Sequence, residues 1–220
     1  MADAAVFERP ATTHEVVLAE LRRRIVAGEI VPGDAIRPDQ LAIELRVSRV
    51  PIREALRILE GEGVVAHRPH HGAVLATLRA EDLREIYRLR QLLEGEAVAA
   101  ALTRLTEVDL GAMHAANDAL TATDPDDLAA LAGANRRFHF ALLGPCEMPH
   151  LLRQITLLWN ATDHYRAAYY REDRHRREVA EDHDRILSTA TARDLEALLA
   201  ALDDHRAHAV TGLGLAPEDR

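Results

Sequence analysis

The pattern of apolar residues changes at residue 78, and this change constrains the fold more than any other feature of the sequence. Before it, glycine and proline residues divide the chain into three short segments of helical period and two short apolar runs. After it, strand signals are missing, and alanine- and leucine-rich stretches of helical period follow one another to residue 211. The sequence therefore predicts a mostly α protein with two domains, a small mixed one over residues 1–78 and an all-helical one over residues 79–220.

The small domain has the element order of a winged helix-turn-helix. Helices are predicted at residues 12–27, 39–45 and 49–60, and the apolar runs 64–66 and 73–76 flank a polar tip and predict a β-hairpin. Two helices joined by a tight turn and followed by a hairpin form a motif whose second helix enters the major groove of DNA. We therefore expect a nucleic-acid partner for this domain.

The helix predicted at residues 49–60 separates apolar from basic residues. Its apolar residues recur at the spacing of one helical face, whereas Arg49, Arg53 and Arg57 are spaced by four and line another face. Guanidinium groups gathered in this way suit backbone phosphates and guanine edges. Ser48 is expected to be the N-cap residue, which leaves the helix N-terminus open to a phosphate. The alternative is a solvated face on which Arg53 and Arg57 form ion pairs. The candidate carboxylates for such pairs are Glu54, Glu60 and Asp39.

The net charge of −9 does not argue against that partner, because the acidic residues are unevenly distributed. Residues 1–78 hold 10 arginines against 11 aspartates and glutamates, whereas residues 79–220 hold 17 against 25. The helical domain therefore carries almost all of the excess negative charge.

Cysteine content and hydropathy exclude several protein classes. Cys146 is the only cysteine, which rules out an intrachain disulfide framework and a multi-cysteine zinc site. No apolar run approaches the roughly 20 residues that span a bilayer, and the N-terminal residues lack the pattern of a signal peptide. The sequence thus predicts a cytoplasmic protein without a membrane partner.

Six helices are predicted in the larger domain, at residues 80–104, 106–122, 125–143, 148–170, 174–190 and 193–211. The short connections between them favour an antiparallel bundle. Asn135 and His139 are four residues apart and share one helical face, while His183 and His205 lie on the last two helices among apolar residues. Three imidazoles and an oxygen ligand inside a bundle suit Zn²⁺ or another divalent transition metal. The alternative is a set of unrelated, partly buried histidines.

Residues 31–78 resemble the DNA-binding domain of the GntR family of bacterial transcription regulators. The matching positions are the Pro32-Gly33 turn, the Leu41-Ala42 pair, the run Val47-Ser48-Arg49-x-Pro51-x-Arg53-Glu54-Ala55-Leu56, the later Leu59-Glu60-x-Glu62-Gly63, and Gly72. The resemblance implies that Arg49, Val50 and Arg53 contact the operator, and that the wing tip His71-Gly72 reaches the minor groove. Asp39 stands where the family often has an arginine. Either Arg37 makes that phosphate contact instead, or the preferred DNA sequence differs.

Residues 79–215 resemble the effector domain of the FadR subfamily, the FCD type. The shared pattern is Asn135 before Phe138-His139, then Glu181-Asp182-His183, then His205 after a further 22 residues. It implies a divalent metal, most simply Zn²⁺ with Ni²⁺ or Mn²⁺ as alternatives, bound by Asn135, His139, His183 and His205. Many members carry Asp where this chain has Asn135, and an amide oxygen is a weaker ligand than a carboxylate. His208, one turn beyond His205, is a competing ligand.

Arg90 lies in the first helix of this domain. By the same resemblance it lies over the metal and pairs with a small carboxylate effector, since a carboxylate can bridge a metal and a guanidinium. The alternative is an ion pair between Arg90 and Glu94 on the surface. Trp159, Asn160 and Tyr165 are candidates for lining the same cavity.

The resemblance implies a ligand-responsive transcription regulator, expected to be a repressor, that binds a palindromic operator as a homodimer. A small organic acid bound at the metal would shift the two DNA-binding domains relative to each other. Two alternatives differ in the helical domain. One is a regulator of the same family that binds acyl-coenzyme A without a metal, and the other is a metalloenzyme with a fused DNA-binding module.

Overall fold

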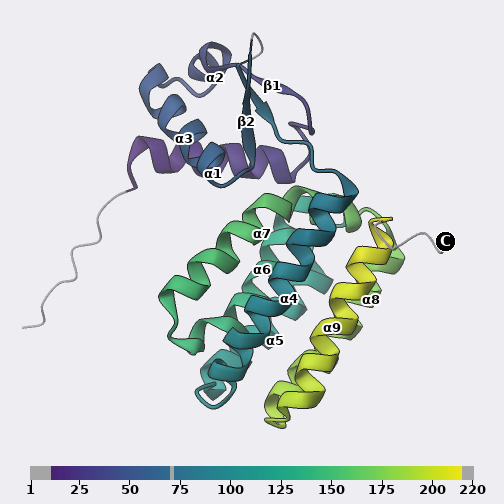
Figure 1. Cartoon of the computed structure of the whole chain (residues 1–220). Helices are drawn as coiled ribbons and strands as arrows, with labels where there is room; N and C mark the ends of the chain where they lie inside the picture. The colour runs from purple at the N-terminus through teal and green to yellow at the C-terminus, as the bar shows by residue number, and fades with distance from the viewer. Residues whose placement is uncertain (1–10, 70–71, 215–220) are drawn as a thin grey trace, which may run out of the picture.

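The computed structural model describes residues 11–69 and 72–214 (Figure 1). The elements of the N-terminal unit are α1 (Thr13–Val26), β1 (Ala35–Ile36), α2 (Pro38–Glu44), α3 (Arg49–Gly61), β2 (Val65–Arg68) and β3 (Gly72–Leu75). The predicted helices and hairpin are therefore formed close to their expected bounds. The sequence does not predict β1, because a strand of two residues carries no periodic signal and depends on β3 lying beside it.

A three-stranded antiparallel sheet closes this unit, with the strands in the order β1-β3-β2. Its helices and sheet share one apolar core, in which Leu21 of α1, Ile52 and Leu59 of α3 and Leu75 of β3 are fully buried. Each such side chain contributes roughly 1.5–3 kcal/mol by leaving water. This core fixes α3 by its apolar face and leaves the opposite, arginine-bearing face outward.

The helical bundle contains α4 (Ala80–Leu102), α5 (Glu107–Ala122), α6 (Leu128–Leu143), the 3-10 turn η1 (Gly144–Cys146), α7 (Pro149–Tyr169), α8 (Asp173–Thr191) and α9 (Leu195–Gly212). The six predicted helices are confirmed. The largest difference is the start of α6, which begins after residue 127 because the Asp127 side chain accepts a hydrogen bond from the Ala130 N–H and caps the helix. No helix among the described residues is both long enough and apolar enough to span a bilayer.

The N-terminal unit rests on the bundle through α1, which packs against α6 and α7 (Figure 1). Val26 contacts apolar residues of the bundle, and the Tyr165 hydroxyl accepts a hydrogen bond from the Leu78 backbone N–H at 2.8 Å. A cavity of about 30 Å³ remains between α1 and α7. It is lined by Arg22, Ile25, Val26, Val64, Asn160, Asp163 and His164. Asn160 and Tyr165 therefore face the N-terminal unit. They were expected to line the effector cavity with Trp159, but they lie on different sides of α7 from it.

His164 makes the packing of α7 sensitive to pH. It is buried, and neither ring nitrogen has a hydrogen-bond partner. Burial lowers its pKa from 6.5 to about 4. The unfolded chain therefore binds more protons than the folded chain between those values, so stability falls as the pH falls through this window. From pH 7.5 to pH 5 we expect His164 to reduce the free energy of unfolding by about 2 kcal/mol, as measured by chemical denaturation at both pH values.

The variant His164→Leu should lose this component, because leucine has no group to protonate. The control is His150→Leu, which replaces an exposed histidine and should retain the wild-type pH dependence. If His164→Leu loses as much stability as the wild type on acidification, the assignment to His164 is wrong.

Candidate functional site

One face of the N-terminal unit presents the residues that were singled out for DNA contact. The side chains of Arg37, Ser48, Arg49, Val50 and Arg53 are all exposed. A groove of about 860 Å³ runs between α2, α3 and the β2-β3 hairpin, and Arg37, Arg53, Arg57, His67 and Gly72 are among the residues that line it. The middle of α3, from Arg53 on, and the hairpin therefore border the same groove. His71 lies outside the described residues, while Gly72 has a φ of +74°, which suits glycine at the start of β3.

Ser48 occupies the N-cap position of α3, as predicted. Its backbone is extended, with φ −70° and ψ 167°, but its side chain makes no capping hydrogen bond. The first backbone N–H groups of α3 therefore have no side-chain acceptor from Ser48. A phosphate placed there would accept from them and would also meet the positive end of the helix dipole.

Asp39 pairs with Arg49 rather than with Arg53 or Arg57. Arg49 Nε lies 2.8 Å from Asp39 Oδ1, and both side chains are more than half exposed. Arg53 and Arg57 form no ion pair with any residue that the structure describes. The ion pairs that the solvated-face alternative gave to Arg53 and Arg57 are therefore absent among the described residues. Arg49 instead pairs with Asp39, and a phosphate or a guanine edge would have to displace that pair.

Removal of the Asp39 carboxylate should tighten DNA binding. Asp39→Ala frees Arg49 and removes a negative charge that repels phosphates, and exposed pairs of this kind are worth up to about 1 kcal/mol. We expect the dissociation constant to fall about two- to fivefold in fluorescence anisotropy with a duplex that the wild type selects from a random library. Asp126→Ala, in an exposed turn of the bundle, is the matched control. Weaker binding by Asp39→Ala would instead mean that Asp39 positions Arg49 for contact.

Three histidines from three helices meet inside the bundle. His139 of α6, His183 of α8 and His205 of α9 place one ring nitrogen each within 4.8 Å of the others, and no other group of this kind is found in the described part of the chain. The Nε2 atoms of His139 and His205 are 3.2 Å apart. Two imidazole nitrogens that share one tetrahedral zinc ion lie about 3.4 Å apart. The spacing of this pair is therefore that of ligands to a common ion.

Neighbouring side chains orient the histidine rings. His183 Nδ1 lies 3.1 Å from Asn117 Oδ1, and His205 Nδ1 lies 3.2 Å from Asp182 Oδ2. Donation of Nδ1–H to these oxygens leaves Nε2 of each ring with a free lone pair. The Phe138 ring also stacks on His183, with ring centroids 3.8 Å apart. Sequence reasoning did not assign this role to Asn117, whose place is apparent only when α5 and α8 are packed together.

Burial keeps the three histidines neutral. It lowers the pKa of His139 well below 6.5, where the neighbouring histidines and arginines act in the same direction, and it also lowers the pKa values of His183 and His205. Neutral imidazole is the form that binds metal. Burial raises the pKa of Asp182, but hydrogen bonds from His205, His208 and Arg185 outweigh it and hold that pKa below its usual value. The ionised Asp182 carboxylate thus orients the His205 ring through its Nδ1 atom.

Asn135 lies one turn before His139 on α6. It is buried, and neither its Oδ1 nor its Nδ2 has a hydrogen-bond partner; His183 Nε2 is likewise buried and unpartnered. Each such atom costs on the order of 1–3 kcal/mol unless a partner is supplied. Three neutral imidazoles and an amide with an unused oxygen make a donor set that fits a divalent transition metal. His208 is not part of the group of histidines whose ring nitrogens meet, although its Nδ1 also lies 2.8 Å from Asp182 Oδ2.

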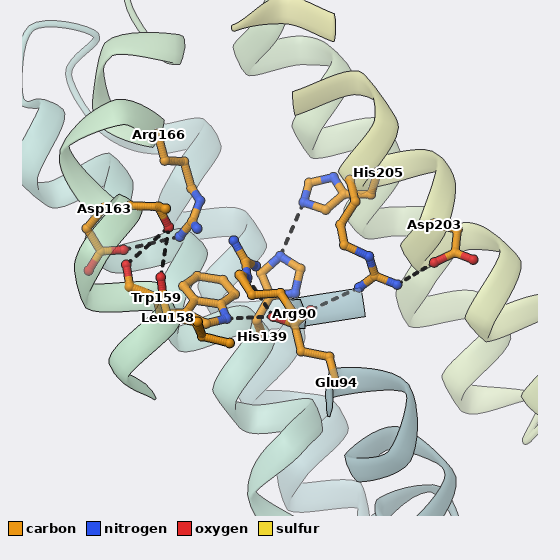
Figure 2. A network of polar contacts seen from close by, with 11 residues as sticks. Arg90, Glu94, His139, Leu158, Trp159, Asp163, Arg166, Asp203 and His205 are labelled. Atoms are coloured by element: carbon orange, nitrogen blue, oxygen red, sulfur yellow. Dashed lines mark hydrogen bonds and ion pairs between the residues drawn. The ribbon is translucent and has the colours of Figure 1, made fainter. Parts of the chain in front are cut away.

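A cavity of about 20 Å³ lies beside the histidines. Its lining includes His139 and His205, the aromatic residues Tyr87, Trp159, Tyr169 and Tyr170, and the arginines Arg90, Arg166 and Arg206. Figure 2 shows Arg90 and Arg166 gathered at the Trp159 ring, and their Cζ atoms lie 4.1 Å and 3.9 Å from its centroid. Trp159 thus lines the cavity, as the sequence suggested, and holds two cations through its ring face.

Glu94 binds three donors at the floor of this site. Arg90 Nε donates to Glu94 Oε1 at 2.8 Å, Trp159 Nε1 donates to the same oxygen at 2.7 Å, and Arg206 Nη1 donates to Oε2 at 2.9 Å. The Arg90–Glu94 pair therefore exists, but the prediction of a surface location is wrong, because both residues are at most 3% exposed. Burial raises the pKa of Glu94, but Arg90 and Arg206 outweigh it and hold that pKa below its usual value.

Each of the three buried arginines has one guanidinium nitrogen for which the described residues supply no acceptor. Arg90 Nη1, Arg166 Nη2 and Arg206 Nε are each buried without a partner. Their carboxylate partners are Glu94, Asp163 and Asp203, and of these only Glu94 is fully buried. Unmatched buried guanidinium donors favour an anion that can accept from them. Arg166 and Arg206 are functional candidates that the motif pattern did not include.

Asp163 connects this site with the cavity under α1. Arg166 Nη1 and Arg136 Nη1 donate to its two oxygens at 3.2 Å and 3.0 Å. Figure 2 shows Asp163 and Arg166 on the same helix, on the side away from His205. Asp163 also lines the cavity between α1 and α7. One carboxylate therefore contacts an arginine of the inner cavity and borders the N-terminal unit.

Family comparisons decide which kind of protein carries these two sites. Residues 13–75 match the family described as "Bacterial regulatory proteins, gntR family", and residues 85–208 match the FCD domain. The chain belongs to the GntR family. It is a GntR-family transcription regulator whose N-terminal unit is the DNA-binding part and whose helical bundle is an FCD domain.

Individual relatives of this GntR regulator cover most or part of the chain. It is 28% identical over 183 residues to the HTH-type transcriptional regulator YdhC of Bacillus subtilis (strain 168). The matched segment covers 81% of this chain and 80% of YdhC. It is 39% identical over 100 residues to the gluconate operon transcriptional repressor of the same strain. That match covers 46% of this chain and 39% of the length of the repressor. The solved structure of E. coli McbR/YncC superposes with a TM-score of 0.81 at 25% identity, covering 93% of this chain and 98% of McbR. All three are named as regulators or repressors, so the metalloenzyme alternative is set aside.

Proposed function

We propose that this GntR regulator senses a small organic acid at a metal site in its FCD domain and, as a homodimer, represses transcription from a palindromic operator. The observation that carries the proposal is the meeting of three histidines with three buried, incompletely paired arginines around one cavity. Asn135, His139, His183 and His205 would hold the metal, and the imidazole-rich donor set favours Zn²⁺ over Mn²⁺. When bound, the metal supplies a positive centre for a carboxylate oxygen.

Arg90 is the proposed effector-binding residue. Its Nε is held by Glu94, while its Nη1 is buried without a partner in the wall of the cavity. A carboxylate oxygen accepting from Nη1 would make a charge-assisted hydrogen bond in a site that excludes water. Because Glu94 and the Trp159 ring already hold the guanidinium, little side-chain entropy remains to be lost on binding.

The proposed DNA contacts are made by Arg37, Ser48, Arg49, Val50, Arg53, His71 and Gly72. The exposure of Ser48, Arg49, Val50 and Arg53 supports this assignment, as does the groove that Arg53 shares with the wing. Arg37 borders the groove beside Asp39, so it is placed to supply the phosphate contact that Asp39 cannot make. We place the boundary between the DNA-binding domain, residues 1–78, and the effector domain, residues 79–220, at the end of the segment that leaves β3.

Two further observations support a homodimeric repressor. Leu89 and Leu92 of α4 are 40% and 53% exposed, and their outward apolar side chains would be covered by a second copy. A two-fold dimer is also the state that reads two halves of a palindrome. One of the relatives is named as a repressor of an operon for gluconate, itself a small organic acid.

A metal-free acyl-coenzyme A sensor is the second candidate, and the cavity argues against it. The inner cavity of about 20 Å³, which is lined by charged and aromatic side chains, cannot bury the long acyl chain of such an effector inside the bundle. Such a regulator would also leave the three clustered histidines without a metal to bind.

Metal content and acid response test the proposed function together. Protein purified without chelator is expected to hold about one zinc ion per chain by elemental analysis. Its affinity for a duplex selected from a random library should change on addition of small carboxylates, and the change should vanish after treatment with a chelator. Protein that binds no stoichiometric metal after reconstitution, yet still binds DNA, would overturn metal-dependent sensing and leave the DNA-binding assignment in place.

A further inference from the structure

Two hollows of the FCD domain share a wall. Outside the inner cavity, a surface groove of about 310 Å³ runs between α4 and α9, lined by Arg84, Tyr87, Arg88, Gln91, Asp203, Arg206, Ala207 and Val210. Tyr87 and Arg206 line both this groove and the inner cavity. These two side chains therefore form the partition between the histidine site and the surface.

The partition carries unsatisfied polar atoms. Tyr87 and Arg206 are 5% and 7% exposed, and the Tyr87 hydroxyl and Arg206 Nε are both buried without a partner. The other two nitrogens of Arg206 donate to Glu94 Oε2 at 2.9 Å and to Asp203 Oδ1 at 2.5 Å. Buried donors of this kind are costly unless an acceptor reaches them. An anionic group at the partition would supply it.

The groove between α4 and α9 combines a basic rim with an apolar floor. Arg88 and Arg206 border it against the single carboxylate of Asp203, while Tyr87, Ala207 and Val210 supply apolar surface. An anion attached to an apolar chain suits this lining. A polyhydroxylated chain would find few partners there for its hydroxyl groups.

The size of the inner cavity limits what enters it. About 20 Å³ holds one water-sized group, such as the end of a carboxylate, and not a whole organic acid. The remainder of a ligand anchored there must lie on the other side of the partition, in the groove of about 310 Å³.

We propose that the effector is a dicarboxylate with an apolar spacer. One carboxylate reaches the inner cavity beside Arg90 and Arg166. The spacer passes the Tyr87 ring, and the second carboxylate lies in the α4–α9 groove between Arg206 and Arg88, where it also accepts from the Tyr87 hydroxyl. This inference rests on the proposed function and deepens it by naming the class of acid.

Isothermal titration calorimetry of the full-length protein reconstituted with Zn²⁺ tests the inference. The probes are pairs of acids of equal chain length: succinate with butyrate, glutarate with valerate, and adipate with hexanoate. In at least one pair the dicarboxylate should bind at least about tenfold more tightly, as expected for one more charge-assisted contact. Arg88→Gln, an exposed substitution, and the isosteric Tyr87→Phe should each reduce this preference, whereas Arg153→Gln on the exposed side of α7 should not.

The possible failures are distinguishable. Equal affinity for the two members of every pair would overturn the dicarboxylate inference and leave carboxylate sensing intact. A dicarboxylate preference that survives both Arg88→Gln and Tyr87→Phe would overturn the placement of the second carboxylate in the groove. Zinc-loaded protein that binds none of the acids would overturn both this inference and the proposed function.

Discussion

Replacement of His183 by glutamine is expected to reduce bound metal from about one ion per chain to a trace. His183 is completely buried, and its Nε2 has no hydrogen-bond partner among the residues that the structure describes. With only two imidazoles left, the site can no longer hold an ion against exchange with solvent. Elemental analysis of wild type and variant after the same purification measures the loss.

Thermal denaturation gives a second readout of the same change. Metal at a concentration about 100 times its dissociation constant stabilises the folded state by about 2.7 kcal/mol. A chelator should therefore lower the melting temperature of the wild type and have little effect on His183→Gln. His150→Gln, at an exposed position, should behave like the wild type. Full metal content in His183→Gln would show that the cluster is not the site.

Asn135→Asp should act in the opposite direction. A carboxylate is a stronger metal ligand than an amide, and this one would lie one turn from His139 on the same face of α6. We expect metal to be lost to a competing chelator at least several times more slowly than from the wild type. If Asn135 does not contact the metal, the variant instead buries an unpaired carboxylate, which lowers stability without slowing metal loss.

Arg49→Ala and Arg53→Ala should each weaken binding of the selected duplex by about ten- to a hundredfold, the range for loss of one good base or phosphate contact. Arg53 borders the groove, and Arg49 is exposed at the start of α3. Fluorescence anisotropy at several salt concentrations separates the two kinds of contact. Loss of a phosphate contact lowers the salt dependence by about one ion, whereas loss of a base contact relaxes sequence preference.

The control for this pair is Arg153→Ala, an exposed arginine on α7 of the effector domain. It changes the net charge equally but should leave the affinity for DNA as in the wild type. Size-exclusion chromatography and metal analysis should give the same result for all three variants. Wild-type affinity in both Arg49→Ala and Arg53→Ala would mean that α3 does not enter the groove of DNA.

The helices could be predicted from the sequence because their apolar residues repeat with a clear period. The three histidines of the cluster were predicted from the sequence, because His139, His183 and His205 each lie among apolar residues of a predicted helix, and the resemblance gives the same three residues. Strand β1 was not predictable, because its two residues, Ala35 and Ile36, become a strand only through pairing with β3. The pairing of Asp39 with Arg49 likewise depends on the angle between α2 and α3.

Arg166 and Arg206 were not predicted from the sequence, because arginine is normally a surface residue. A signal for them does exist in the helical period. Leu198, Leu202 and Arg206 are spaced by four on α9, so Arg206 continues a buried apolar stripe, and Arg166 lies two turns after the buried Trp159 on α7. An arginine that continues the apolar face of a predicted helix is therefore a candidate site residue, as a histidine in that position is.

Asp163 links the proposed acid site with the DNA-binding unit, because it contacts Arg166 and also lines the cavity between α1 and α7. An acid that accepts a hydrogen bond from the unpartnered Nη2 of Arg166 would contact the guanidinium whose Nη1 donates to Asp163, and that carboxylate also borders the cavity covered by α1. Thermodynamic linkage makes any such effect reciprocal: the factor by which the acid changes affinity for DNA is the factor by which DNA changes affinity for the acid. If the proposed acid sensing holds, the acid concentration at which transcription responds is set by the affinity of the operator-bound protein for the acid. An affinity measured on the free protein differs from it by that factor.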